Sequence, residues 1–160
     1  MKKYRPVFAT LIALLFYTCT DILIWQRVFE ANQLTQHAHT YHTGWFVTLA
    51  GYGLLGMLLM WGAWKDVAYF LISLFVGAFS GLEDVLYYVL DGKAMPELLP
   101  WLDPNPMIFG VTRVQVVSSV LFWMAALIVL YVALYEWRRG RGPGVIAQEQ
   151  PVVTEQMPAS

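Results

Sequence analysis

Charged residues are scarce in this chain of 160 residues, and their scarcity excludes most classes of soluble protein. Asp, Glu, Lys and Arg together make up 13% of the sequence, whereas a soluble domain averages about 25%. The formal net charge is −1, so the basic footprint of a nucleic-acid-binding protein is missing. We therefore expect no nucleic-acid partner.

Cysteine and histidine are also rare. Cys19 is the single cysteine, which excludes a disulfide within the chain and the cysteine-based metal motifs. The three histidines all lie in one short polar segment, so no apolar run carries an axial ligand for haem. We expect neither haem nor a nucleotide as cofactor.

Apolar residues are what the chain has in excess: 58% of the sequence is hydrophobic, and the mean hydropathy is +0.53. A helix needs about 20 apolar residues to cross a bilayer. Four segments meet that length: about 6–25, 45–64, 67–90 and 110–137. The pattern predicts an all-α integral membrane protein, in which a four-helix transmembrane bundle occupies residues 1–139.

Basic residues predict the orientation of this bundle, because cytoplasmic loops are enriched in Lys and Arg. One side would carry most of them, namely Lys2, Lys3, Arg5, Lys65, Arg138, Arg139 and Arg141. We therefore expect a multi-pass protein with both termini in the cytoplasm, in the plasma membrane if the source is prokaryotic. Residues 140–160 are rich in Gly, Pro, Gln and Glu, which is typical of a disordered cytoplasmic tail.

Acidic residues inside the apolar runs are the main candidates for function. Glu83 and Asp84 lie in the third run, where an ionised carboxylate costs roughly 2.5–3.5 kcal/mol near the bilayer centre. Counted along the helices, Asp21 and Arg113 fall in the same outer layer as this pair. Asp84 would centre a continuous stripe of small and polar residues on the third helix. Glu83, about 100° away, would be better placed to meet Arg113.

The first loop of the outer side contains a histidine cluster, formed by His37, His39 and His42. Imidazole and carboxylate groups bind Zn²⁺ and non-haem iron, so these histidines could join Asp21 and Asp84 in a metal site. A solvated loop without a metal is the alternative. The second outer loop, 91–106, has four prolines and several apolar residues, and we expect it to form a rim over the bundle.

Three functions are compatible with this layer. The first is a metal-dependent, hydrolase-like enzyme with Zn or non-haem iron, acting on a lipid or amphipathic substrate from the extracytoplasmic side. Its catalytic candidates are Asp84, Glu83 and Arg113. The second is a non-enzymatic subunit or assembly protein, braced by an Arg–carboxylate network. The third is a cation-binding or small-ligand-binding protein. Expected partners are membrane lipid, other membrane subunits or a second copy of the chain.

Overall fold

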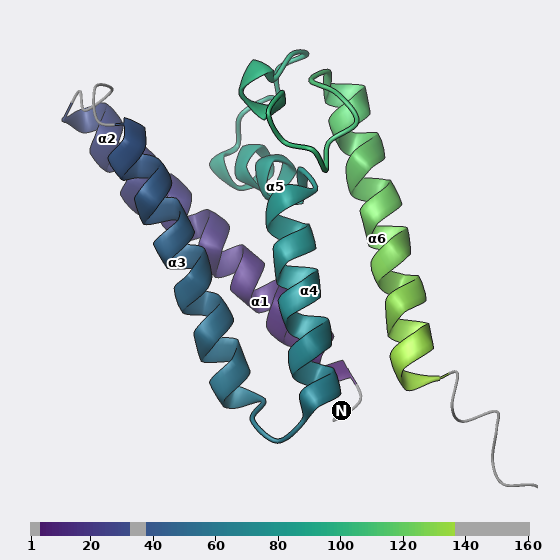
Figure 1. The fold of residues 1–160 in the computed structure, drawn as a ribbon. Coiled ribbons are helices and arrows are strands. Elements are labelled where there is room, and N and C mark those ends of the chain that lie inside the picture. The colour runs from purple at the N-terminus through teal and green to yellow at the C-terminus, as the bar shows by residue number, and fades with distance from the viewer. Residues whose placement is uncertain (1–3, 33–37, 137–160) are drawn as a thin grey trace, which may run out of the picture.

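The computed structural model describes residues 4–32 and 38–136, and this part of the chain is helical without a strand. Figure 1 shows long helices that run along one another and a short helix across one end. In chain order the elements are α1 (Arg5–Thr20), the π-helix η2 (Asp21–Gln26), α2 (Arg27–Ala31), α3 (Ala38–Leu59), α4 (Trp64–Phe79), α5 (Leu82–Asp91), the 3₁₀ turn η4 (Pro100–Leu102) and α6 (Arg113–Tyr135). The predicted tail, 140–160, lies outside the described residues.

Within the part of the chain that the structure describes, two helical segments are long and apolar enough to span a membrane, Arg5–Gln26 and Arg113–Tyr135. Helices α4 and α5 make a third if the bent pair is one span. Large apolar side chains on the first and last segments face outward: Phe8 is 60% exposed and Val129 is 69% exposed. Such exposure is unfavourable in water and favourable in lipid. These features indicate a membrane protein. Helix α3 begins at Ala38 instead of Trp45, so its first turns are polar.

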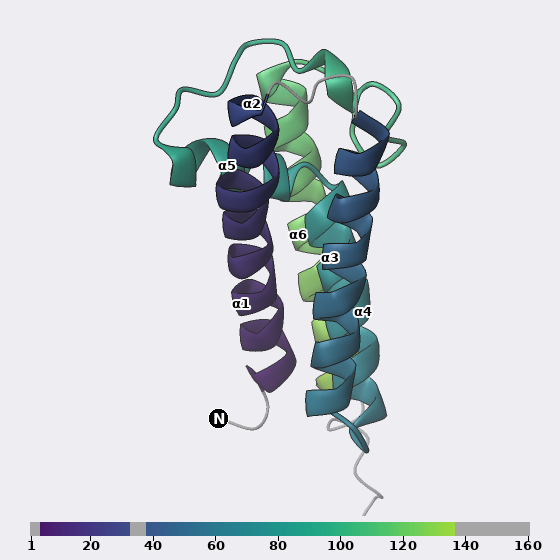
Figure 2. The same ribbon diagram turned by 90° about the vertical axis from the view of Figure 1, so that its left-hand side faces the viewer.

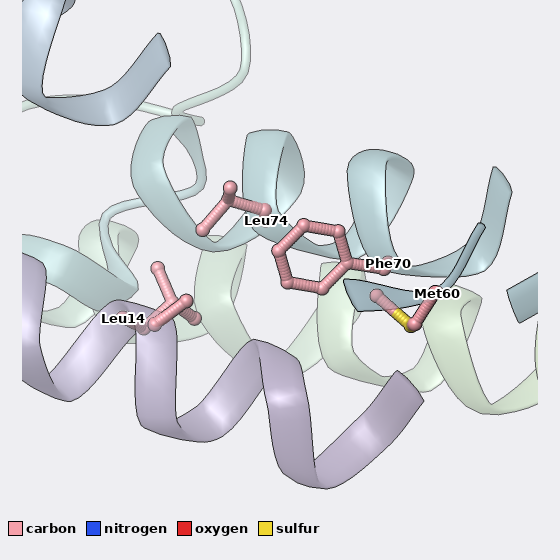
Figure 3. Packing of buried hydrophobic residues seen from close by; sticks show 5 residues of the cluster. Leu14, Met60, Phe70 and Leu74 are labelled. Atoms are coloured by element: carbon pink, nitrogen blue, oxygen red, sulfur yellow. The ribbon is translucent and has the colours of Figure 1, made fainter. Parts of the chain in front are cut away.

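Helix α4 is the centre of the arrangement, since it packs against α1, α3, α5 and α6. Figure 3 shows the buried cluster between them, which includes Leu14, Met60, Phe70 and Leu74. Glycine lets α3 approach the Phe70 ring closely: a Cβ at Gly56 would lie 2.2 Å from it. This is the packing role that small residues have in membrane helices.

The third predicted span is not a continuous helix. Helices α4 and α5 meet at a 66° bend at Ser80 and Gly81, and α5 lies across the end of the bundle (Figures 1 and 2). Gly81 has a φ of +89°, which a residue with a Cβ rarely adopts. The bend leaves the Phe79 carbonyl without its helical partner, and Asn105 Nδ2 donates to it at 2.8 Å. The predicted stripe around Asp84 is therefore interrupted at Gly81.

The segment between α5 and α6 folds back over this same end, as the thin green trace in Figure 1 shows. Leu99 and Leu102 are buried against Val116 of α6. The Leu99 amide donates to Val111 O at 2.7 Å, and α6 starts with a capping box between Thr112 and Gln115. The four-proline segment is thus anchored by packing and backbone hydrogen bonds.

Candidate functional site

A cavity of about 570 Å³ lies at the end of the bundle that α5 covers. Its walls come from η2, the first turns of α3, the end of α4, α5 and the segment that contains η4. The lining residues are Asp21, Gln26, Tyr41, His42, Trp45, Phe46, Ala78, Phe79, Glu83, Asp84, Tyr87, Tyr88, Trp101, Leu102, Pro104, Asn105 and Pro106. Helix α6 contributes none of them. We call this cavity the acidic pocket.

Three carboxylates line the acidic pocket: Asp21 of η2 and Glu83 and Asp84 of α5. Two of them accept a hydrogen bond from an aromatic side chain. The Tyr41 hydroxyl donates to Asp21 Oδ1 at 2.8 Å, and the Trp101 indole donates to Asp84 Oδ1 at 3.3 Å. Helix rise predicts one level for these three acids, and the structure brings them to one cavity.

Glu83 differs from its neighbours because one of its oxygens is buried without a partner. Only 6% of Glu83 is exposed, and its Oε1 is buried without a hydrogen bond from any described residue. Glu83 and Asp84 belong to the first turn of α5, where the positive end of the helix dipole partly offsets their charge. The dipole does not supply a hydrogen-bond donor to Oε1, so a buried acceptor is left open to the cavity.

Tyr41 is fixed as a hydrogen-bond donor. Its side chain is packed at the start of α3, before the predicted second span. Burial, followed by the charge of the neighbouring Asp21, raises the pKa of the Tyr41 hydroxyl above its ordinary value of 10. The phenol therefore stays protonated and donates to the carboxylate.

The π-helix η2 brings Gln26 to the pocket together with Asp21. A π-helix relates positions five residues apart, which an α-helix places on different faces. The Thr18 and Thr20 hydroxyls just before it donate to the carbonyls of Leu14 and Phe16. The predicted first span ends at residue 25, so Gln26 falls in the loop that follows it. No residue pattern in 21–26 distinguishes a π-helix from an α-helix.

The ion pair predicted for Arg113 is not found among the described residues. Its Nη1 donates to the Met95 carbonyl at 3.3 Å, and its backbone amide donates to Glu97 O at 2.9 Å. Arg113 is the first residue of α6, which does not line the acidic pocket. It holds the α5–α6 segment instead of meeting Asp21, Glu83 or Asp84.

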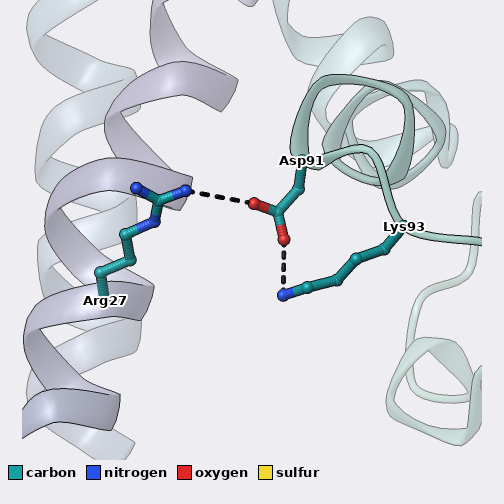
Figure 4. Close-up of polar contacts among 3 residues, drawn as sticks. All are labelled: Arg27, Asp91 and Lys93. Carbon is teal, nitrogen blue, oxygen red and sulfur yellow. Dashed lines mark hydrogen bonds and ion pairs between the residues drawn. The ribbon is translucent and has the colours of Figure 1, made fainter.

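Two described cations are engaged by an acid outside the pocket. Figure 4 shows Asp91, at the end of α5, between Arg27 and Lys93. The Asp91 carboxylate lies 3.4 Å from Arg27 Nη2 and 2.5 Å from Lys93 Nζ. Within residues 4–32 and 38–136, neither Lys nor Arg lines the acidic pocket.

Of the two histidines that the structure describes, one lines the pocket. His42 lines the acidic pocket, whereas His39 is exposed at the start of α3 and does not line it. His37 lies outside the described residues. Among those that are described, no three His, Cys, Asp or Glu side chains form a group that could hold a metal ion.

Aromatic residues make up half of the remaining lining. Seven aromatic residues line the pocket: Tyr41, Trp45, Phe46, Phe79, Tyr87, Tyr88 and Trp101. Trp101 is 55% exposed and reaches the pocket from the folded-back segment. Trp45, Phe46 and Phe79 carried no sequence signal for a site, because aromatic residues in an apolar run are typical of lipid-facing or core positions.

Comparison of the sequence with protein-family models and with curated proteins, and comparison with solved structures, gives no match. The chemistry of the acidic pocket is thus the basis for a functional assignment.

Proposed function

We propose that this protein binds a cationic organic molecule in the acidic pocket. The observation that carries the proposal is Glu83, a buried carboxylate with an unpartnered oxygen on the wall of a cavity. A buried charge without a partner is costly, and a bound cation removes that cost. The brace between Arg113 and the pocket carboxylates, expected for a purely structural role, is not found among the described contacts.

The distribution of charge supports a cation over an anion. The pocket contains three carboxylates, and the described cations nearby contact Asp91 or backbone carbonyls. A helix N-terminus ordinarily attracts anions, but here Glu83 and Asp84 occupy the first turn of α5. The site is therefore already supplied with negative charge, and its ligand should bring the positive charge.

The aromatic wall supports an organic cation over a simple metal ion. Cations bind over the faces of Trp and Tyr rings, and ligand pockets of about 300–1,000 Å³ are typical of small organic molecules. A cavity of about 570 Å³ fits within that range. A metal ion would need three or more close ligands, which the described residues do not assemble.

We further propose that α1, α3, the α4–α5 pair and α6 form a four-span bundle with both termini in the cytoplasm. The described ends of α1 and α6 and the turn between α3 and α4 lie at the same end in Figure 1, opposite α5. Arg5 and Lys65 lie at that end, and Lys2 and Lys3 precede Arg5 in the sequence. The positive-inside rule therefore favours a cytoplasmic location for this end. The acidic pocket would then open on the extracytoplasmic side.

The test is calorimetric titration of the full chain in non-ionic maltoside micelles with three probes of similar shape and different charge. Phenethylammonium is the cation, phenethyl alcohol is neutral and 3-phenylpropionate is the anion. We expect saturable binding of the cation alone. Glu83→Gln should weaken it by about tenfold or more, because a charge-assisted hydrogen bond is lost.

Glu97→Gln is the matched control, because it makes the same chemical change at an exposed position outside the pocket. It should leave the dissociation constant unchanged. Equal heats for the three probes, or equal losses in both variants, would contradict the proposal.

A further inference from the structure

We infer that the ligand is a primary ammonium ion on an apolar body, with an N–H group that donates to Glu83 Oε1. This inference rests on the proposed function and specifies its ligand class. Two kinds of organic cation could neutralise the pocket. A quaternary ammonium has charge and no N–H, whereas a primary ammonium has charge and three donors. The hydrogen-bond state of the pocket distinguishes them.

Three hydrogen-bond donors of the acidic pocket contact groups other than Glu83. The Tyr41 hydroxyl donates to Asp21, and the Trp101 indole donates to Asp84. The Asn105 amide donates to the Phe79 carbonyl, which the bend at Gly81 leaves free. These bonds hold η2, α3, α5 and the folded-back segment in place. None of these donors reaches Glu83 Oε1, which stays unpartnered in the described structure.

A quaternary ammonium would neutralise Glu83 without forming a hydrogen bond to it. Its methyl groups would cover Oε1 and leave a buried acceptor unsatisfied, which is costly in an interior of low dielectric constant. A primary ammonium supplies both charge and donor. Asp84 and Asp21 line the same cavity, and their negative charge adds to the attraction for a cation.

The remainder of the ligand should be apolar. Beyond the three acids, most lining residues are aromatic or aliphatic; the polar exceptions are Gln26, His42 and Asn105. Such a wall buries hydrocarbon favourably and gives little to a second polar group. A polyamine with charges along its whole length would fit less well, because its second ammonium would lie against aromatic and aliphatic side chains.

The experiment compares phenethylammonium with phenethyltrimethylammonium on the same protein by calorimetric titration in maltoside micelles. The two probes share a ring and a charge and differ in their N–H groups. We expect the primary amine to bind about tenfold or more tightly than the quaternary one. In Glu83→Gln the ratio should fall to about twofold or less, since the N–H then meets a neutral acceptor. Glu97→Gln should retain the full ratio.

Each other outcome has a defined meaning. Equal affinity for the two cations, with no binding of phenethyl alcohol, overturns the N–H requirement and leaves the proposed function standing. Tighter binding of the quaternary probe overturns the inference in favour of recognition by ring faces alone. Failure of both cations to bind overturns the proposed function itself. Because the main comparison uses two ligands on the unaltered chain, it does not depend on the folding of a variant.

Discussion

The two ends of the helix bundle both contain polar side chains among apolar helices. The polar groups named at one end contact other helices, whereas at the other end one of them has an oxygen without a partner among the described residues. At the α3–α4 turn, Lys65 Nζ donates to Leu134 O at 3.1 Å and the Tyr135 hydroxyl donates to Asp66 Oδ1 at 2.5 Å. Arg5 of α1 donates to the Leu59 carbonyl. Each of these three charged side chains joins one helix end to another through a hydrogen bond. At the pocket end, the buried acid Glu83 has an oxygen without a hydrogen-bond partner among the described residues.

This difference separates structural polarity from polarity that is available to a ligand. Polar groups within a membrane protein normally pair with one another or line a cavity. The α3–α4 end follows the first course, with contacts that join α4 to α6. At the pocket end, the polar groups line a cavity, where three carboxylates lie among aromatic side chains. The following predictions test this division.

The largest effect should come from the apolar layer between the two ends. Phe70 is buried in the cluster of Figure 3 and packs against Gly56. Phe70→Ala should lower the free energy of unfolding by about 3 kcal/mol. This is the low end of the range for buried Phe, because lipid is itself apolar and the loss is mainly of packing contacts. Thermal unfolding in maltoside micelles measures it, with exposed Phe8→Ala as the control. Equal losses in the two variants would contradict the assignment of this core.

The second effect concerns the bend that creates the pocket. Gly81→Ala should cost about 2–3 kcal/mol, because Ala is strained at φ +89° and its Cβ would lie 2.7 Å from Val116. Gly92 is the matched control: it has a φ of +68°, but a Cβ added there would have no heavy atom within 4 Å. Gly92→Ala should therefore cost only the backbone share, about 1 kcal/mol. If both changes cost the same, the contact with Val116 does not constrain the bend.

The sequence predicts where the apolar helices and the three pocket acids lie better than it predicts how the helices bend and pack. Apolar run lengths locate α1 and α6 closely, and helix rise places Asp21, Glu83 and Asp84 at one level, which their common pocket agrees with. The different positions predicted for Glu83 and Asp84, one on the flank and one on the polar stripe, assume that the helix continues without a bend through Gly81. A single glycine within an apolar run does not reveal whether the helix continues or bends.

The bend and the position of Trp101 could not be predicted because they depend on long-range contacts. The bend is held by Val116 and Asn105, which follow Gly81 by 35 and 24 positions in the numbering. No local pattern reports such partners. The same holds for Trp101, whose indole reaches Asp84 only because Leu99 and Leu102 anchor the folded-back segment on α6.

A third prediction compares one acid from each end. Asp66→Asn should lower the free energy of unfolding by about 1 kcal/mol, because it weakens the short hydrogen bond from Tyr135. Glu83→Gln should leave stability within about 0.5 kcal/mol or raise it, because removing a buried charge offsets the lost interaction with the α5 dipole. Unfolding without added ligand measures both. A loss in Glu83→Gln as large as that in Asp66→Asn would make Glu83 structural.

The smallest effect should come from a pair of tyrosines. The Tyr17 hydroxyl is buried without a partner among the described residues, while its ring contacts Trp45 and Tyr52 at centroid distances of 5.3 and 6.4 Å. Tyr17→Phe retains the ring and removes an unsatisfied group, so stability should stay level or rise by about 0.5 kcal/mol. Tyr135→Phe removes the donor to Asp66 and should cost about 1 kcal/mol. If the free energy of unfolding falls in Tyr135→Phe but does not fall in Tyr17→Phe, the Tyr135 hydroxyl stabilises the fold and the Tyr17 hydroxyl does not. A loss in Tyr17→Phe equal to that in Tyr135→Phe would mean that the Tyr17 hydroxyl stabilises the fold, and the contrast between the two ends would then rest on Glu83 alone.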